Sequence, residues 1–194
     1  SALVQGADSH LYGLTTTGGV AGAGTVYRCT TAGVLTSLAA FTGTTGALPG
    51  TTPQGMIRQA ADGWFYGTTS SGGFYNLGTI YRFHPSAGAQ SLFTFGLAAD
   101  GGSQNQTNVN FISRACQFVA GNDGYLYGGN GSTIFRIHQQ PAMQGIAATS
   151  ITPDSATLTA SVIPNQDDAV VDFQYGVSTS YGAQTAAQNV PAGT

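Results

Sequence analysis

The sequence predicts an all-β protein: a propeller-like array of four-stranded blades, two full and one partial, followed by a partial β-sandwich. A unit of turn, strand, glycine loop and strand occurs three times along the chain. Its spacing is regular, because the arginine of each copy follows the previous one by 54 residues, at Arg28, Arg82 and Arg136. No segment shows a helical period of apolar residues. Short strands repeated at a long fixed period are typical of propeller blades.

Each repeat divides into strand candidates separated by turns. Asp62-Gly63 and Asp123-Gly124 are strong hairpin signals, and Asp8-Ser9 is a weaker version of the same turn. The strand after each turn carries large rings on one face by the two-residue period. We expect these rings to be core or inter-blade residues: Tyr12, Trp64, Tyr66 and Tyr127.

The repeats occupy residues 1–138, and the third one has no fourth strand. Since a closed propeller needs about four to eight blades, these repeats cannot close a ring by themselves. Residues 139–147 are expected to form a linker. Residues 148–194 do not follow the repeat pattern and contain three or four strand candidates.

Two resemblances follow from these motifs. The run from Asp62 to Gly73, continued by Gly78 to Arg82, resembles the GloVer (Gloeo/Verruco) tandem repeat. That resemblance implies a secreted bacterial surface protein with propeller-type repeats, and it carries over no catalytic residues. Ser155-Ala156-Thr157-Leu158 and Phe173-Gln174-Tyr175-Gly176 resemble the opening half of a fibronectin type III-like domain, an immunoglobulin-like sandwich of about seven strands.

Charges are scarce along the chain. Lysine and glutamate are absent, and five arginines against eight aspartates give a net charge of −3. Such a chain has no electrostatic footprint for nucleic acid and no basic cluster for an anionic membrane surface. Its apolar runs are too short to insert in a membrane. The composition is typical of an extracellular or cell-surface protein, although no signal peptide is visible.

No constellation for catalysis can be assembled from these residues, and the sequence predicts no catalytic, cofactor-binding or metal site. His84 and His138 share a register, but a structural zinc site needs four ligands. Arg28, Arg82 and Arg136 have two readings: a ring of guanidiniums for an acidic ligand, or repeated structural contacts. Repetition in every unit favours the structural reading. We also expect no disulfide between Cys29 and Cys116, because a whole blade separates them.

These observations favour a non-enzymatic extracellular structural protein, a cell-surface, sheath or filament subunit. The unfinished third blade and sandwich leave open β-edges, which predict self-association through strand pairing. A longer precursor that contains the missing strands is the other explanation of the open edges. The alternative function is a surface adhesin that binds glycans or other ligands on the loop face of the blades, with Trp64 or Tyr125 as stacking residues.

Overall fold

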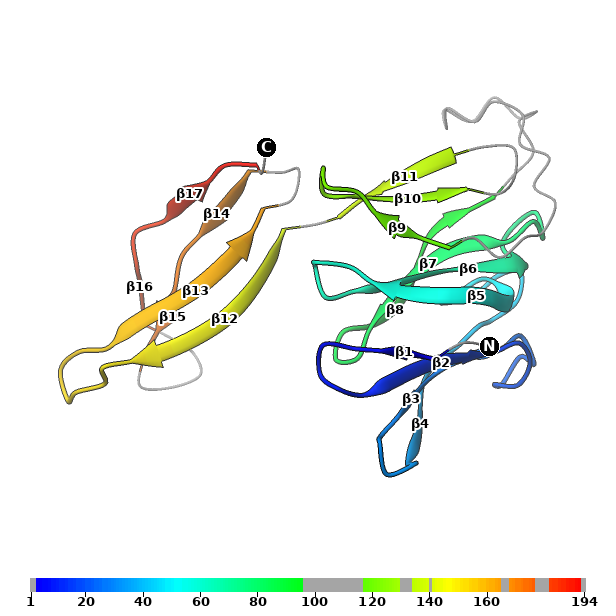
Figure 1. Cartoon of the computed structure of the whole chain (residues 1–194), viewed down its shortest axis with the longest axis horizontal. Helices are drawn as coiled ribbons and strands as arrows, with labels where there is room; N and C mark the ends of the chain where they lie inside the picture. Colours follow the sequence, from blue (N-terminus) through cyan, green and yellow to red (C-terminus); the bar gives the residue numbers. More distant parts are fainter. Residues whose placement is uncertain are drawn as a thin grey trace. The chain divides into compact units, whose positions relative to one another are not determined.

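The computed structural model describes residues 3–95, 117–129, 134–139, 141–164, 168–176 and 182–192, and all regular structure in them is β-strand. The chain forms two compact units. The first, here the blade unit, contains Ser1–Ala120 and Leu126–Arg136, and the second, here the C-terminal unit, contains Gly121–Tyr125 and Ile137–Thr194. Figure 1 shows the strands of both units.

Blade one is an antiparallel meander in the order β1-β2-β3-β4. Its strands are β1 (Val4–Gln5), β2 (Leu11–Thr15), β3 (Thr25–Cys29) and β4 (Leu35–Ala40). Tyr12 pairs with Arg28 across β2 and β3, and Leu11 pairs with Cys29. Directly paired residues project to the same face of a sheet. The register therefore fixes which side chains share each face of the blade.

Blade two repeats this meander in the order β5-β6-β7-β8. Its strands are β5 (Thr51–Gln59), β6 (Phe65–Ser71), β7 (Thr79–His84) and β8 (Gly88–Thr94). Tyr66 pairs with Arg82, as Tyr12 pairs with Arg28 in blade one. β5 is longer than the sequence indicates because it extends back through Pro53, an edge-strand position that tolerates proline.

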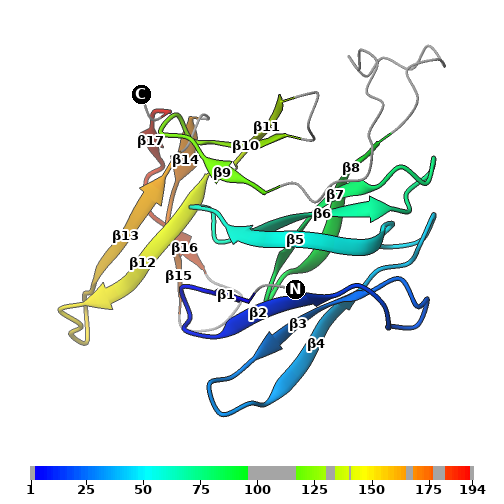
Figure 2. The same cartoon turned by 45° about the vertical axis from the view of Figure 1, so that its right-hand side comes forward.

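Blade three has three strands in the described residues, in the order β11-β10-β9. They are β9 (Val119–Ala120), β10 (Tyr125–Gly129) and β11 (Ile134–His138). Tyr127 pairs with Val119, which places both side chains on one face. Figure 2 shows the three sheets from a second angle, with blade two between the other two.

The two faces of a blade pack differently, and we name them for clarity. The leading face of blade one carries Leu3, Leu11, Tyr27 and Cys29, and that of blade two carries Ile57, Phe65, Tyr81 and Phe83. The trailing face carries the residues that alternate with these along each strand. In blade one these are Val4, Tyr12, Leu14, Val26 and Arg28, and in blade two they include Tyr66, Ile80 and Arg82.

The core lies where the trailing face of blade one meets the leading face of blade two. Tyr12 lies with its ring centroid 4.4 Å from Phe65 and 5.9 Å from Phe83, and Phe41 packs edge-on against Tyr81 at 4.8 Å. The contact with blade three follows the same pattern, since Tyr66 meets Phe118 at 6.5 Å. Burial of these rings is the main stabilising term of the blade unit.

The described residues of the C-terminal unit form three two-stranded antiparallel ladders: β12 with β13, β14 with β17, and β15 with β16. Their bounds are β12 (Ala142–Thr149), β13 (Thr157–Ile163), β14 (Ala169–Val171), β15 (Gln174–Tyr175), β16 (Ala183–Gln184) and β17 (Gln188–Val190). β12 runs through most of the range 139–147, for which the sequence suggests a linker. The apolar residues Met143, Ile146 and Ala148 do not follow the two-residue spacing of a strand throughout. A bulge interrupts the pairing after Gln144, so the sequence gives no clear strand signal there.

The predicted all-β class is confirmed, with small antiparallel sheets of two to four strands. The face-to-face packing of the blades is consistent with the predicted propeller-like array. The boundaries 1–138, 139–147 and 148–194 stay predictions, and so does the fibronectin type III-like character of the last segment.

Candidate functional site

The aspartate that begins each repeat organises the turn end of its blade. The backbone N–H two residues later donates to its carboxylate: His10 to Asp8 at 3.2 Å, Trp64 to Asp62 at 3.1 Å, and Tyr125 to Asp123 at 3.3 Å. Each aspartate thereby closes a turn of the kind that short polar side chains favour. The aspartates of all three turns thus have a structural role.

The same carboxylate also receives a tyrosine hydroxyl from the following strand. Tyr12 Oη donates to Asp8 at 2.8 Å, and Tyr66 Oη donates to Asp62 at 2.6 Å. Burial, followed by the hydrogen bond to Asp8 and its charge, raises the pKa of Tyr12 to about 12. Burial is also the largest cause of the raised pKa of Tyr66, and the hydrogen bond to Asp62 and the charge of that carboxylate raise it further. These hydroxyls therefore stay protonated and serve as hydrogen-bond donors.

The repeated arginines lie beside these tyrosines. Arg28 and Arg82 each hydrogen-bond the tyrosine of their own blade, and each counteracts part of the rise in that tyrosine's pKa. Burial works to raise the pKa of Asp8, but the bonds from Tyr12 and His10 and the charge of His10 outweigh it, so this pKa lies below its ordinary value. In blades one and two, the tyrosine hydroxyl therefore contacts both the arginine and the aspartate of its blade. Arg136 is exposed on β11.

A glutamine amide joins the turns of the first two blades. Gln59 Oε1 accepts the backbone N–H of Ala7 in blade one at 2.8 Å. Its Nε2 donates to the carbonyl of Gly63 in its own turn at 3.1 Å. Gln5 stands 54 residues earlier and points its Nε2 at Ser9 O, 3.5 Å away. Sequence reasoning missed this link, although the repeat of glutamine at that spacing is a visible signal.

Trp64 is half-buried at the turn end of blade two rather than inside the core. The guanidinium of Arg82 lies 4.3 Å from the centre of its ring, a cation–π arrangement. His84 packs on the same indole with ring centroids 5.6 Å apart. In blade three, Tyr125 and His138 form the corresponding pair at 5.4 Å. The two histidines thus pack on aromatic rings.

The opposite end of blades one and two carries a glycine-rich loop. A threonine pair ties its base, Thr15 with Thr25 at 2.8 Å in blade one and Thr69 with Thr79 at 3.0 Å in blade two. The loop of blade two presents two aromatic side chains to solvent, Phe74 and Tyr75, with exposed fractions of 74% and 39%. Their rings meet edge-on at 4.9 Å. Two adjacent aromatics within a glycine loop are a signal that the sequence interpretation did not use.

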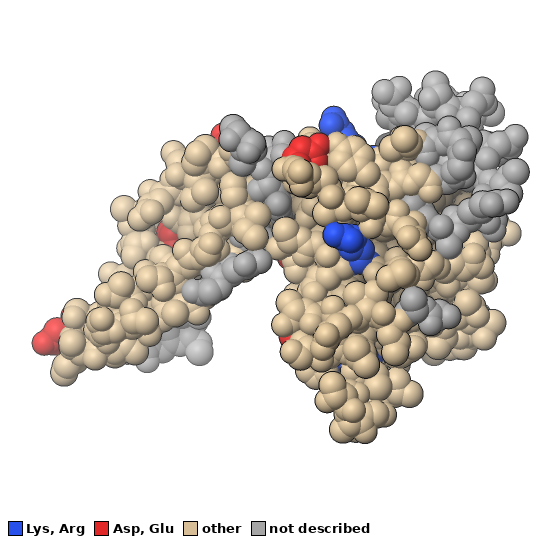
Figure 3. All heavy atoms as spheres, viewed as in Figure 1, with Lys and Arg blue, Asp and Glu red and all other residues tan. Residues whose placement is uncertain are grey.

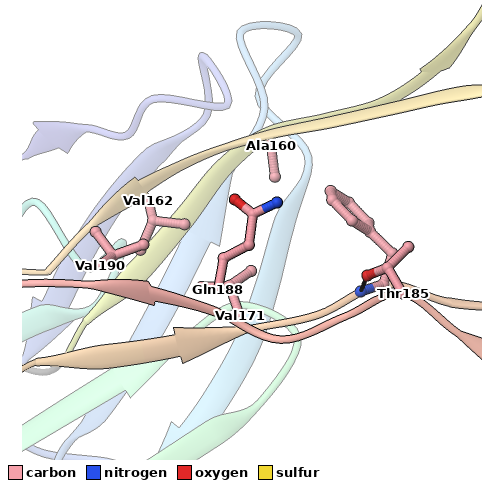
Figure 4. A pocket seen from close by; sticks show the side chains of 7 residues that line it. Ala160, Val162, Val171, Thr185, Gln188 and Val190 are labelled. Carbon is pink, nitrogen blue, oxygen red and sulfur yellow. Dashed lines mark hydrogen bonds between the residues drawn. The ribbon is translucent and has the colours of Figure 1, made fainter.

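The C-terminal unit contains a cleft of about 190 Å³ between its ladders. Ala160 and Val162 of β13 face Val171 of β14 and Val190 of β17 across it (Figure 4). The side chains of Phe173, Thr185 and Gln188 complete its lining. Five of the seven lining residues are apolar, so the cleft resembles the unfilled interior of a sandwich rather than a reactive site.

Charged groups are sparse on the molecular surface, as Figure 3 shows for one face. In the residues that the structure describes, no group of three or more His, Cys, Asp or Glu side chains is arranged to hold a metal ion. Within the same residues, no helix combines the length and apolar character that a membrane crossing needs. Cys29 forms no disulfide with another described residue, and Cys116 lies outside the described residues, so the expectation about their pairing stays a prediction.

The turn-end clusters, the glycine loops and the spacing of 54 residues define one repeated unit in the first two blades. The chain matches no curated protein and no solved structure. The model of the Gloeobacter/Verrucomicrobia repeat matches residues 1–189, which is most of the chain and includes strands of the C-terminal unit. This protein therefore belongs to the Gloeobacter/Verrucomicrobia repeat family.

Proposed function

We propose that this repeat protein is a non-enzymatic structural subunit of a bacterial cell surface, sheath or filament. The observation that carries the proposal is the open architecture of the C-terminal unit. Among the residues that the structure describes there, its three ladders have two strands each, and they leave the apolar cleft between β13, β14 and β17 accessible. Isolated two-stranded ladders are marginally stable in water, so additional strands would stabilise this unit.

A neighbouring subunit can supply those strands by adding to an open edge, as in other cases where one chain completes another's sheet. The scarcity of charge supports dense packing, because few ionised groups would lose their hydration on assembly. The roles of the repeated aspartates and arginines support a non-enzymatic function, since their contacts hold turns and strands together.

The test is electron microscopy of the purified protein together with localisation in the producing cell. We expect ordered filaments or sheets, and surface labelling with an antibody against the blade unit. Val162→Asp, which places a carboxylate in the cleft, should abolish ordered assembly, whereas Val170→Asp on the exposed side of β14 should not. Dispersed particles for the unmodified protein, or turnover in a broad substrate screen, would refute the proposal.

A surface adhesin is the second candidate, and the aromatic pair of the blade-two loop favours it. Exposed aromatic rings can stack against the apolar faces of sugars, and Phe74 and Tyr75 project from a loop rather than from the core. Saturable binding to a glycan array that is lost in Phe74→Ala would support this function. Trp64→Ala serves as the comparison, because Trp64 lies at the other end of the blade.

A further inference from the structure

The glycine loops of blades one and two, residues 18–24 and 72–78, share one backbone frame. In blade two, the N–H of Asn76 donates to the carbonyl of Gly73, and the N–H of Gly78 donates to the carbonyl six residues before it, both at 3.0 Å. The equivalent bonds in blade one measure 3.1 Å and 3.0 Å. Each loop therefore holds a four-residue turn at its tip on a closed base.

The two residues in the middle of this turn differ between the blades. They are Val20 and Ala21 in blade one, and Phe74 and Tyr75 in blade two. All four are exposed to solvent. The repeat thus keeps the frame and changes the two side chains that the frame presents.

Blade two restrains its loop more strongly than blade one does. Asn76 Oδ1 accepts the N–H of Gly72 at 2.8 Å, a bond that Gly22 has no side chain to make at the equivalent place in blade one. The N–H of Gly73 donates to the carbonyl of Gly43, in the connection between the two blades, at 3.0 Å. A frame fixed before binding lowers the entropy that a ligand contact must offset.

The chemistry of the blade-two tip favours an uncharged sugar ring. Residues 70–78 contain no Asp, Glu, His, Lys or Arg, so the tip offers neither a partner for an ionised ligand nor the basic residues that hold a loop to an anionic membrane. Phe74 and Tyr75 supply aromatic surface, and the exposed Asn76 supplies an amide whose orientation the bond to Gly72 fixes. So small a tip is far from the roughly 20–30 residues that each side of a stable protein–protein interface contributes.

We propose that the glycine loop is a fixed frame whose two tip residues set what a blade binds, and that Phe74, Tyr75 and Asn76 bind one neutral sugar unit. This inference rests on the adhesin function, the second candidate above, and it names the ligand class and the residues that determine specificity. The blade-one tip has only aliphatic side chains at Val20 and Ala21, so it provides no ring on which a sugar can stack.

An exchange of tips within the full chain tests the site. The double variant Phe74→Val/Tyr75→Ala places the blade-one tip on the blade-two frame, so thermal unfolding should not change. Its binding to the neutral sugars of a glycan array should weaken roughly 30-fold, because two aromatic contacts are lost. Asn76→Gly should weaken binding roughly fivefold through loss of the fixed frame. Val20→Ala, at the tip of blade one, is the matched control and should bind normally.

The reverse exchange tests the frame. Val20→Phe/Ala21→Tyr/Gly22→Asn builds the blade-two tip on blade one. Gly22 and Asn76 both have a positive φ, 68° and 55°, and a β-carbon at residue 22 meets nothing within 4 Å. Titration calorimetry with the neutral oligosaccharide that gives the strongest array signal should therefore find a second site per chain.

Each outcome separates the site from the adhesin function. Glycan binding that survives the Phe74→Val/Tyr75→Ala exchange, or binding confined to acidic glycans of the array, would overturn the neutral-sugar site and leave the adhesin function standing. No binding to any glycan would overturn both. Binding to phosphatidylcholine vesicles that is lost in the same exchange would overturn the sugar assignment in favour of a membrane contact. An unchanged number of sites in the reverse exchange would overturn the role of the frame.

Discussion

The hydroxyl of Tyr81 lies over the α-carbon of Gly67, its direct partner on the adjacent strand. A β-carbon at residue 67 would lie 2.5 Å from Tyr81 Cζ and closer still to the hydroxyl oxygen. Tyr27 lies over Gly13 in the same way in blade one. Glycine in the middle of these strands thus makes room for a ring that packs flat across the sheet.

This contact predicts a large effect of Gly67→Ala. The added methyl group must displace a fully buried ring, and we expect a loss of about 3 kcal/mol of unfolding free energy, at the upper end for overpacking. Urea denaturation provides the measurement. Gly182→Ala, where a β-carbon meets nothing within 4 Å, should be nearly neutral. Equal stabilities of the two variants would mean that Tyr81 does not occupy this position.

Two buried tyrosines should respond in opposite directions to loss of their hydroxyl. Tyr81 Oη is buried without a hydrogen-bond partner, whereas Tyr66 Oη donates to Asp62 at 2.6 Å. Tyr81→Phe should therefore leave stability unchanged or raise it by about 1 kcal/mol, and Tyr66→Phe should lower it by about 2 kcal/mol. Phe135 already occupies the equivalent position in blade three. Destabilisation by Tyr81→Phe would point to a partner for its hydroxyl.

Alkaline pH should destabilise the blade unit. Folding raises the pKa of Tyr12 to about 12, from about 10 in an unfolded chain. A group whose pKa is raised on folding contributes its full stabilisation of the folded state at pH values below its pKa in the unfolded chain. That contribution is lost as the pH rises toward its pKa in the folded protein. Unfolding free energy should thus fall between about pH 10 and 12, as tyrosinate absorbance rises. Tyr12→Phe should reduce this dependence, and an unaltered pH profile in that variant would contradict the assignment.

Gln59→Ala should loosen the attachment of blade one to blade two. The change removes the acceptor of the Ala7 N–H and the donor to Gly63 O, and we expect a cost of about 1–2 kcal/mol. Gln5→Ala removes one long contact within blade one and should cost much less in the monomer. Thermal unfolding at low protein concentration compares the two. A larger effect at Gln5 would contradict the role assigned to Gln59 as the link between the two blades.

The repeat spacing allowed much of the blade architecture to be predicted, because residues 54 apart take equivalent places. Tyr12 and Tyr66, which the sequence placed on one face, both pair with the arginine of their blade and are fully buried. Trp64 lies near the same face but is half-buried, because the strand period gives the face and not the extent of the neighbouring sheet. The Gln59 link and the Phe74–Tyr75 pair depend on contacts between separate segments, which no single segment reveals.

Blade two packs through Phe65 on one side and through Tyr66 on the other, so its amide protons are shielded by a neighbour in both directions. Hydrogen exchange should reflect this as a gradient along the chain rather than a single rate. In a stack with nearest-neighbour coupling, the outer sheets open first and the middle one opens last. The slowest-exchanging amides should accordingly lie in β6 and β7, and those of β2 and β3 should exchange faster.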